Sequence, residues 1–277
     1  DNSLGDGVWR MSGSVIVVTS GKGGVGKTTA TASIGAALAM MGPSVVLIDA
    51  DIGLRNLDLV LGLEGRIFHN LVDVVDGAVD AHKALIRHKD IKNLSLLPAA
   101  QSRDKTAVTP ESMKAIADEL KSSFDFVIID CPAGIEQGFK NAVAGAEKAV
   151  VVTTPEMSAV RDADRIIGML EHEGIADPWL IINRIRFDMV KKHDMLDVND
   201  VLEHLKIELL GVIPDDEAII VATNKGIPVV MDEKSKAGRA FRDVAARIMG
   251  EDVPMAAAAE EEDWFTRIIR WFARARG

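Results

Sequence analysis

Cysteine, excess basic charge and long apolar runs are what this sequence most clearly lacks. One cysteine, Cys131, among 277 residues excludes an intramolecular disulfide and an iron–sulfur cluster ligated by several cysteines, and it fits a reducing compartment. Lysine and arginine number 32 against 42 aspartates and glutamates, so the net charge of −10 argues against a general nucleic-acid-binding surface. No apolar run reaches the ~18 residues that a membrane-spanning helix needs.

What the sequence does contain is a series of short runs rich in valine and isoleucine, alternating with helical stretches. Continuous apolar runs are typical of strands in a parallel sheet that is covered on both faces. We therefore expect an α/β fold, a doubly wound and mostly parallel sheet with helices on both faces. The strands are expected at 14–19, 44–49, 93–98, 125–130, 148–153, 179–183 and 208–213. The main helices are expected at 28–41, 110–122, 158–172 and 236–249.

The domain organisation follows from changes in composition. Residues 14–250 are long and apolar enough for one large domain. Residues 1–13 are expected to be an N-terminal extension, and 1–10 lack the apolar core of a secretory signal. Met11 as a natural start would make 1–10 a remnant of cloning, and removal of a transit peptide is the alternative origin. Residues 251–263 form an alanine-rich acidic linker, and 264–277 have a different, amphipathic character.

A glycine-rich loop between the first strand and the first helix fits the phosphate-binding pattern G-x-x-x-x-G-K-[ST] in its proper context. Glycines let backbone N–H groups surround phosphate oxygens, and the helix that follows adds its positive N-terminal end. Lys27 is placed to reach the β- and γ-phosphates, and the Thr28 hydroxyl is placed to ligate Mg²⁺. We expect nucleotide contacts at Gly21, Lys22, Gly23, Gly24, Val25, Gly26, Lys27, Thr28 and Thr29.

Carboxylates follow two other strands at the same expected edge of the sheet. Asp130 ends the fourth strand and matches an acid that holds Mg²⁺, usually through water, while Asp51 lies two residues beyond the second strand. Asp51 is expected to orient the attacking water and to lie at the metal, since phosphoryl transfer depends mainly on positioning and charge neutralisation. Gly134 is expected to let a switch segment approach the γ-phosphate closely.

The nucleotide base needs a separate pocket, and two strand ends offer one. Asn183 ends the sixth strand with Arg184 beside it, and its amide has the donor and acceptor that an adenine edge requires. Pro214 and Asp215 follow the seventh strand and are expected to form the other wall.

These motifs resemble a known family. The sequence K-G-G-x-G-K-T at residues 22–28 is that of the deviant-Walker (MinD/ParA) family of P-loop ATPases. The stretches 49–58, 130–136, 154–156, 183–184 and 211–216 are similar to the branch of that family that positions bacterial and plastid division sites. Cys131 departs from the serine usual there, and the 183–184 pair is closer to cyanobacterial or plastid members.

The resemblance has functional implications that no spacing or composition supplies. It implies slow, Mg²⁺-dependent ATP hydrolysis with Lys22, Lys27 and Asp51 as catalytic residues, and an ATP-dependent homodimer. In that dimer Lys22 would cross the interface to the partner's nucleotide. The resemblance also implies a MinC-like division inhibitor and a MinE-like activator as partners.

The last fourteen residues predict a helix that lies in a membrane surface. At 100° per residue the apolar residues cluster on one face and Arg267, Arg270 and Arg274 on the opposite face, while Arg276 breaks the pattern at the end of the segment. About 21 Å of helix is too short for a hydrocarbon core of roughly 30 Å, so the segment should lie in the interface and bind anionic lipid weakly, more strongly when a dimer joins two copies. The predicted membrane contacts are Trp264, Phe265, Arg267, Ile268, Ile269, Arg270, Trp271, Phe272 and Arg274.

The expected function is therefore an ATPase in the cytoplasm or plastid stroma that binds the inner face of a membrane reversibly, recruits a division inhibitor there and is released on hydrolysis. A DNA-segregation ATPase like ParA is one alternative, but it needs a basic surface that the acidic balance and the tail argue against. A related ATPase that places flagella would share the tail, so only its partners distinguish it. An iron–sulfur carrier is disfavoured by the single cysteine, and a ligase of the dethiobiotin synthetase type has no use for the tail.

Overall fold

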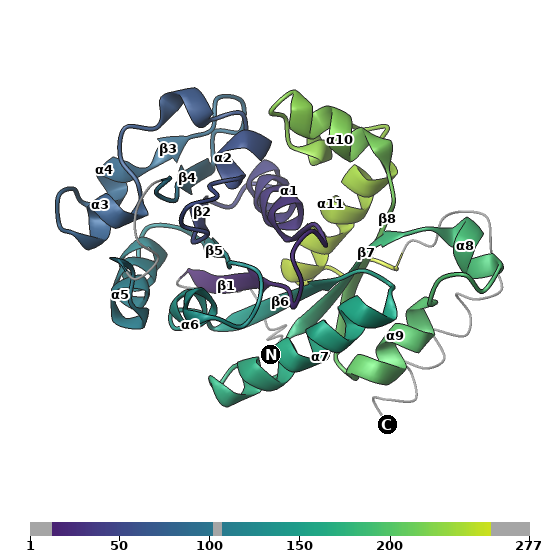
Figure 1. The fold of residues 1–277 in the computed structure, drawn as a ribbon. Helices are drawn as coiled ribbons and strands as arrows, with labels where there is room; N and C mark the ends of the chain where they lie inside the picture. The colour runs from purple at the N-terminus through teal and green to yellow at the C-terminus, as the bar shows by residue number, and fades with distance from the viewer. Residues whose placement is uncertain (1–12, 102–106, 256–277) are drawn as a thin grey trace, which may run out of the picture.

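The computed structural model describes residues 13–101 and 107–255 and builds them around one eight-stranded sheet (Figure 1). Its strands run in the order β3-β4-β2-β5-β1-β6-β7-β8. In chain order the strands are β1 (Ser14–Thr19), β2 (Val45–Asp49), β3 (Ile86–Arg87), β4 (Leu94–Leu97), β5 (Phe126–Asp130), β6 (Lys148–Thr153), β7 (Trp179–Ile185) and β8 (Glu208–Pro214).

The strands pair in parallel except at one edge. β1 lies between β5 and β6, β2 lies between β4 and β5, and all of these pairs are parallel. β3 pairs antiparallel with β4, with Ile86 opposite Leu96, and forms one edge of the sheet. The expected mostly parallel, doubly wound sheet is confirmed, with this short antiparallel edge strand as an eighth strand that apolar patterning did not predict.

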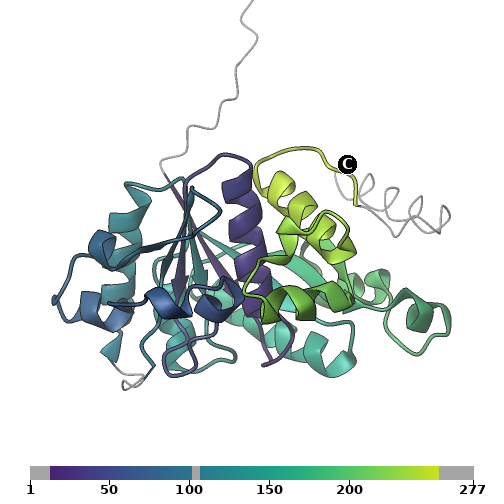
Figure 2. The ribbon, with the colours of Figure 1, turned by 90° about the horizontal axis from the view of Figure 1, so that it is seen from above.

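Helices cover both faces of the sheet (Figures 1 and 2). The longer helices are α1 (Lys27–Met40), α5 (Pro110–Lys121), α7 (Met157–His172), α9 (Val198–Leu205), α10 (Glu217–Asn224) and α11 (Lys236–Ile248). Shorter helices and two 3₁₀ turns fill the connections: α2 (Leu57–Val60), η1 (Glu64–Arg66), α3 (Leu71–Val75), α4 (Ala81–Ala84), α6 (Gln137–Val143), α8 (Phe187–Lys191) and η3 (Val229–Met231).

The core consists of two apolar layers, one on each face of the sheet. Along β1, Val15 and Val17 pack into the layer beneath α5, α6, α7 and α9, whereas Ile16 and Val18 pack into the layer beneath α1 and α11. Each such buried side chain contributes roughly 1.5–3 kcal/mol relative to exposure. Because both faces are covered, the strand has no polar alternation, which is why continuous apolar runs predicted it.

Helix α1 lies very close to the sheet, and its small residues make this possible. A Cβ added at Gly35 would lie 2.4 Å from a methyl group of Leu47 on β2. The alanines along α1 are buried from end to end, so the helix packs on β2 and β5 on one side and against α11 on the other. This packing fixes the N-terminus of α1 at the carboxyl end of β1, next to the point where the strand order changes direction.

Within the described residues, none of the helices is both long enough and apolar enough to cross a bilayer. The predicted membrane helix at 264–277 and most of the predicted linker lie outside those residues.

Candidate nucleotide site

The phosphate loop joins β1 to α1 and takes backbone conformations that favour glycine. Gly24 and Gly26 have φ angles of 81° and 93°, and α1 begins at Lys27 directly after Gly26. A Cβ at Gly26 would lie 2.2 Å from the side-chain nitrogen of Asn183, so a larger residue fits neither the conformation nor the space. Nothing lies within 4 Å of a Cβ at Gly24, so the loop is open on that side. The geometry fits a cradle for phosphate oxygens.

Asp130 is the centre of a buried charge network at the base of this loop. The Lys27 ammonium lies 2.9 Å from Asp130 Oδ1, and the Thr28 hydroxyl donates to Asp130 Oδ2 over 2.8 Å. The Thr31 hydroxyl lies 3.0 Å from Asp130 Oδ1 and from the Lys27 carbonyl oxygen, either of which can accept its proton. Burial by itself lowers the pKa of Lys27, but the charge and hydrogen bond of Asp130 outweigh it and raise the pKa above its ordinary value.

The same residues suit Mg²⁺ and a triphosphate. Thr28 and Asp130 offer one hydroxyl and one carboxylate, and the described residues contain no group of three or more His, Cys, Asp or Glu side chains that could hold a metal. Mg²⁺ keeps several waters and is usually bound through one or two protein oxygens plus substrate phosphates, so a sparse set of this kind matches it. Lys27 is buried with a single carboxylate, which a γ-phosphate would join as a second anionic partner.

Asp51 lies in a loop that a second buried carboxylate holds together. Asp49, at the end of β2, accepts the backbone N–H of Asp51 at 3.0 Å and that of Leu57 at 3.2 Å. Asp49 also lies directly opposite Asp130 in the β2–β5 pairing. Burial, followed by the charge of Asp130, raises the pKa of Asp49 to about 7. Sequence reasoning missed Asp49 as a positioning residue, although its place as the last residue of a buried strand was a usable signal.

The segment after Asp130 is hydrogen-bonded to the chain just before the phosphate loop. Gly134 has a φ of 92°, and its N–H donates to the Ser20 carbonyl over 3.3 Å. Cys131 is fully buried, and burial raises the pKa of its thiol to about 12. A thiol that stays protonated in an apolar setting is a packing residue, in keeping with its lone occurrence.

The prediction that Asn183 ends its strand is wrong, because β7 continues to Ile185 through its pairing with β8, and Pro214 is likewise the last residue of β8. The two strands stay joined beyond this point, where Asp215 N–H donates to the Ile185 carbonyl over 3.0 Å. Asn183, however, is 2% exposed, and its side-chain nitrogen donates to the Val25 carbonyl over 2.8 Å. Its side-chain oxygen is buried and has no hydrogen-bond partner among the described residues. Asn183 therefore supports the phosphate loop from below, and its contact with adenine stays a prediction. Arg184 is exposed, with a φ of 56°.

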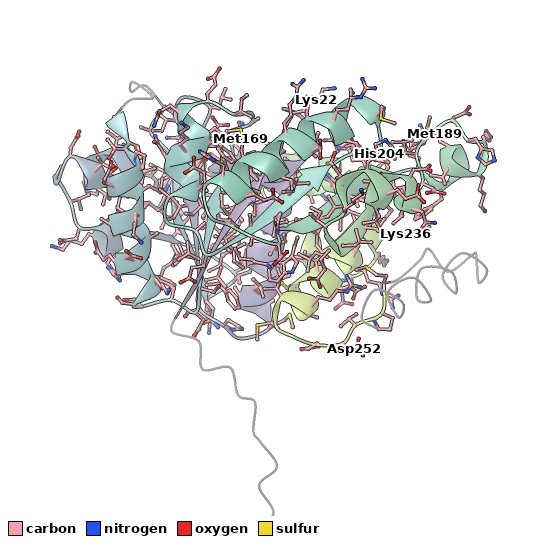
Figure 3. The ribbon with its side chains drawn as sticks, turned by 90° about the horizontal axis from the view of Figure 1, so that it is seen from below. Lys22, Met169, Met189, His204, Lys236 and Asp252 are labelled. Atoms are coloured by element: carbon pink, nitrogen blue, oxygen red, sulfur yellow. The ribbon has the colours of Figure 1, made fainter. Side chains whose placement is uncertain are left out.

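Lys22 stands apart from this network. Its side chain is exposed and makes no hydrogen bond or ion pair with any residue that the structure describes. Figure 3 places Lys22 at one margin of the molecule and Asp252 at the opposite margin.

A phosphate loop, a strand-end carboxylate and a parallel sheet are together typical of a P-loop NTPase, and a comparison with protein-family models agrees. The model of the ParA family, described as "NUBPL iron-transfer P-loop NTPase", matches residues 12–249. The chain therefore belongs to this family of P-loop NTPases.

Comparison with individual relatives shows which kind of P-loop NTPase the chain resembles. A septum site-determining protein MinD of Bacillus subtilis is 55% identical over 266 residues, which are 95% of this chain and 99% of the relative. The MinC:MinD cell division complex of Aquifex aeolicus matches with 48% identity and a TM-score of 0.82, covering 88% of this chain and 98% of the other. MinD of Pyrococcus horikoshii, solved with Mg-ADP, matches with 31% identity and a TM-score of 0.78, covering 87% and 99%.

The chain thus belongs to the MinD septum site-determining proteins, as its motifs predicted. It is an ATPase of the kind that positions the division site, with ATP and Mg²⁺ as nucleotide and metal. This assignment is favoured over the DNA-segregation alternative.

Proposed function

We propose that the chain works as an ATP-dependent homodimer that recruits a MinC-like inhibitor to a membrane and leaves the membrane after hydrolysis. The observation that carries this proposal is the likeness to the Aquifex aeolicus protein solved in a MinC:MinD complex. The proposed division of labour assigns ATP hydrolysis to residues 14–250 and membrane attachment to 264–277, with 251–263 as the linker and 1–13 as an extension.

The proposed chemistry uses the network around Asp130. Lys27 shifts its ammonium from Asp130 toward the γ-phosphate, which leaves Asp130 and Thr28 to face the metal. Mg²⁺ neutralises phosphate charge when bound. Asp51 orients the attacking water, held in place through the Asp49 hydrogen bond to its backbone N–H. Asn183, Arg184, Pro214 and Asp215 are proposed to border the base.

Lys22 is proposed to complete the site of the partner subunit. Its exposed side chain, without a partner in the described part of its own chain, is available for a contact across an interface. A lysine that reaches a phosphate only in the dimer would couple nucleotide state to assembly. A MinE-like activator would then act on this assembled site.

Membrane attachment is proposed to follow from dimerisation. Residues 264–277 carry four arginines and no acidic residue, so anionic lipid attracts each segment by about 1 kcal/mol per basic residue near the surface. A short helix binds weakly alone, and joining two copies raises avidity by roughly 10²–10⁴. The described chain reaches Asp252 on the margin opposite Lys22 (Figure 3), so attachment would not obstruct the phosphate loop.

The test is sedimentation with vesicles of phosphatidylcholine and phosphatidylglycerol in ATP, ADP or no nucleotide, with phosphate release measured in parallel. Wild type should sediment with ATP only, and Asp51→Ala should sediment with ATP while releasing little phosphate. Ile268→Glu places a charge in the apolar face and should abolish sedimentation without changing ATP affinity. Thr266→Glu adds the same charge on the opposite face and is the matched control. Sedimentation of Ile268→Glu at the wild-type level refutes the tail as anchor.

Binding of a purified partner distinguishes division-site placement from the remaining alternative, flagellar placement. A flagellar-placement ATPase would share nucleotide site and tail. ATP-dependent binding of a purified MinC-like inhibitor to the vesicle-bound chain supports division-site placement, and failure to bind it under ATP favours the flagellar alternative.

A further inference from the structure

A groove with a volume of about 430 Å³ lies at the β3 edge of the sheet, away from the nucleotide site. We call it the edge groove, and it is formed by Gly65, Arg66, Phe68, His69 and residues 83–87. Its charged lining side chains are all cationic, Arg66, Lys83 and Arg87, with His69 beside them and no carboxylate. In a chain with a net charge of −10, a hollow lined in this way is electrostatically distinct.

The cations of the edge groove have few partners. Lys83 pairs with Asp80 at 3.0 Å, but both side chains are strongly exposed, so solvent screens the pair. Arg66 donates to the Arg87 carbonyl at 3.4 Å, and the Arg87 guanidinium makes no hydrogen bond or ion pair with the described residues. The charges are therefore available to an anionic partner.

The edge groove also offers an apolar contact and an open backbone. Phe68 is 89% exposed, so its ring is accessible for an apolar contact. His88 N–H donates to the Leu94 carbonyl on β4, and Arg87 is the neighbouring residue of the strand, so alternation turns the Arg87 N–H outward. An outward N–H at a strand edge can pair with a carbonyl of an extended segment.

One segment of this chain has the complementary composition. Residues 256–263 read Ala-Ala-Ala-Ala-Glu-Glu-Glu-Asp, with an apolar half and an acidic half. The four acids directly precede the basic helix proposed to bind anionic lipid, where they oppose that binding. Neither ATP hydrolysis nor membrane attachment gives this acidic run a role, whereas a cationic groove does.

The segment cannot reach the edge groove of its own subunit. Arg247 holds the chain at the β8 side, donating to the carbonyls of Leu210, Val253 and Pro254. β3 and β8 are opposite edges of the sheet (Figure 1), separated by seven strand spacings or roughly 34 Å. From Met255, the eight residues to Asp263 span at most about 29 Å when fully extended.

We propose that the edge groove binds residues 256–263 of a second copy of this chain. Glutamates 260–262 pair with Arg66, Lys83 and Arg87, while the alanines lie along Phe68. The contact joins the β8 side of one molecule to the β3 side of the next, so it is heterologous and builds open rows of molecules. Exposed ion pairs are individually weak, so rows form chiefly where membrane attachment raises the local concentration.

The direct test uses a fluorescein-labelled peptide of residues 256–263 and the full-length chain in solution, with binding followed by anisotropy. Neither ATP nor membrane is needed, so failure here is distinguishable from failure of the proposed function. Lys83→Glu/Arg87→Glu should weaken binding by roughly tenfold, because two exposed pairs are lost. Lys114→Glu, an exposed lysine outside the groove, is the matched control and should stay within about twofold of wild type.

A charge swap makes the test specific. A peptide with Glu261→Lys and Glu262→Lys should bind wild type poorly and the Lys83→Glu/Arg87→Glu chain better than the unswapped peptide does. We call the Lys83→Glu/Arg87→Glu chain the reversed-groove variant. Equal binding of the original peptide to wild type and to this variant, or no binding to either, overturns the proposal.

Vesicle sedimentation then distinguishes an edge groove that binds a second copy of the chain from one that binds lipid. With ATP, wild-type sedimentation should rise more steeply with protein concentration than that of the reversed-groove variant, and the two should agree at low concentration. Loss of binding by the variant at the lowest concentration, with unchanged peptide affinity, makes the edge groove a lipid site instead and refutes the proposal.

Discussion

The phosphate loop and the edge groove both gather cationic side chains, but they differ in how those charges are held. Lys27 is 6% exposed and lies 2.9 Å from a carboxylate that is 1% exposed. In the edge groove Lys83 is 75% exposed, and its pair with Asp80 is a surface pair. A buried charge is tolerated only with a fixed partner, whereas an exposed one is solvated without any.

The two regions differ in how closely their function depends on the stability of the fold. Around Asp130 a single substitution is expected to alter chemistry and folding together, since the charges there are desolvated and share that carboxylate. In the edge groove charge can be reversed at little cost to the fold, so an effect there reports on binding. Substitutions around Asp130 and in the edge groove should therefore differ in how strongly they affect folding.

The largest effect is expected for Lys27→Ala. It removes the charge proposed to face the γ-phosphate and leaves the buried Asp130 without its charged partner, a change that typically costs about 3–5 kcal/mol when one member of a buried pair is lost. ATP hydrolysis should disappear and the midpoint of urea unfolding should fall. A variant with wild-type hydrolysis contradicts the assignment of Lys27.

Lys22→Ala tests the contrast between two lysines of the same loop. The Lys22 side chain is exposed and makes no hydrogen bond or ion pair with the described residues, so its loss should leave folding and nucleotide affinity near wild type. Dimerisation with ATP should nevertheless be prevented. Light scattering of both proteins with ATP checks this, and an unchanged dimer fraction rules out the cross-interface role.

Much of this arrangement could be predicted from the sequence because its signals are local. The phosphate loop, Asp51 and Asp130 follow strands whose apolar runs are continuous, and the carboxyl ends of parallel strands meet at one edge. β1 and β6 were predicted with their observed bounds. The helix predicted at 28–41 runs from Lys27 to Met40.

Features that depend on distant contacts could not be predicted. β3 has only two residues and no periodicity of its own, and it exists because β4 lies beside it. Short helices such as α4 and α8 lack a long apolar pattern. The contact of Asn183 with the Val25 carbonyl joins residues 158 apart, so an asparagine at a strand end could only be assigned to the open side of the site.

A smaller effect is expected from pH on the free energy of unfolding, and it tests the raised pKa of Asp49. Its pKa is raised to about 7 in the fold, against about 3.9 unfolded, so the folded state binds more protons between those values. The free energy of unfolding should therefore lose a contribution from Asp49 as pH rises from about 4 to about 7. Asp49→Asn should flatten that part of the stability profile, measured by urea unfolding at several pH values. A profile unchanged by the substitution contradicts the raised pKa.

The smallest effect on the isolated protein is expected at Phe68. Because 89% of its side chain is already exposed, Phe68→Ser removes almost no buried area, and unfolding free energy should change by no more than about 0.5 kcal/mol. ATP hydrolysis without membrane should equal that of wild type, since the edge groove lies away from the phosphate loop. The affinity for the 256–263 peptide should nevertheless fall severalfold, as the alanines lose their apolar contact. Phe139→Ser, at a side chain 1% exposed, is the opposite case and should destabilise the fold strongly. If Phe68→Ser instead destabilises the fold, Phe68 is a packing residue. The contrast between the buried nucleotide site and the exposed edge groove is then wrong.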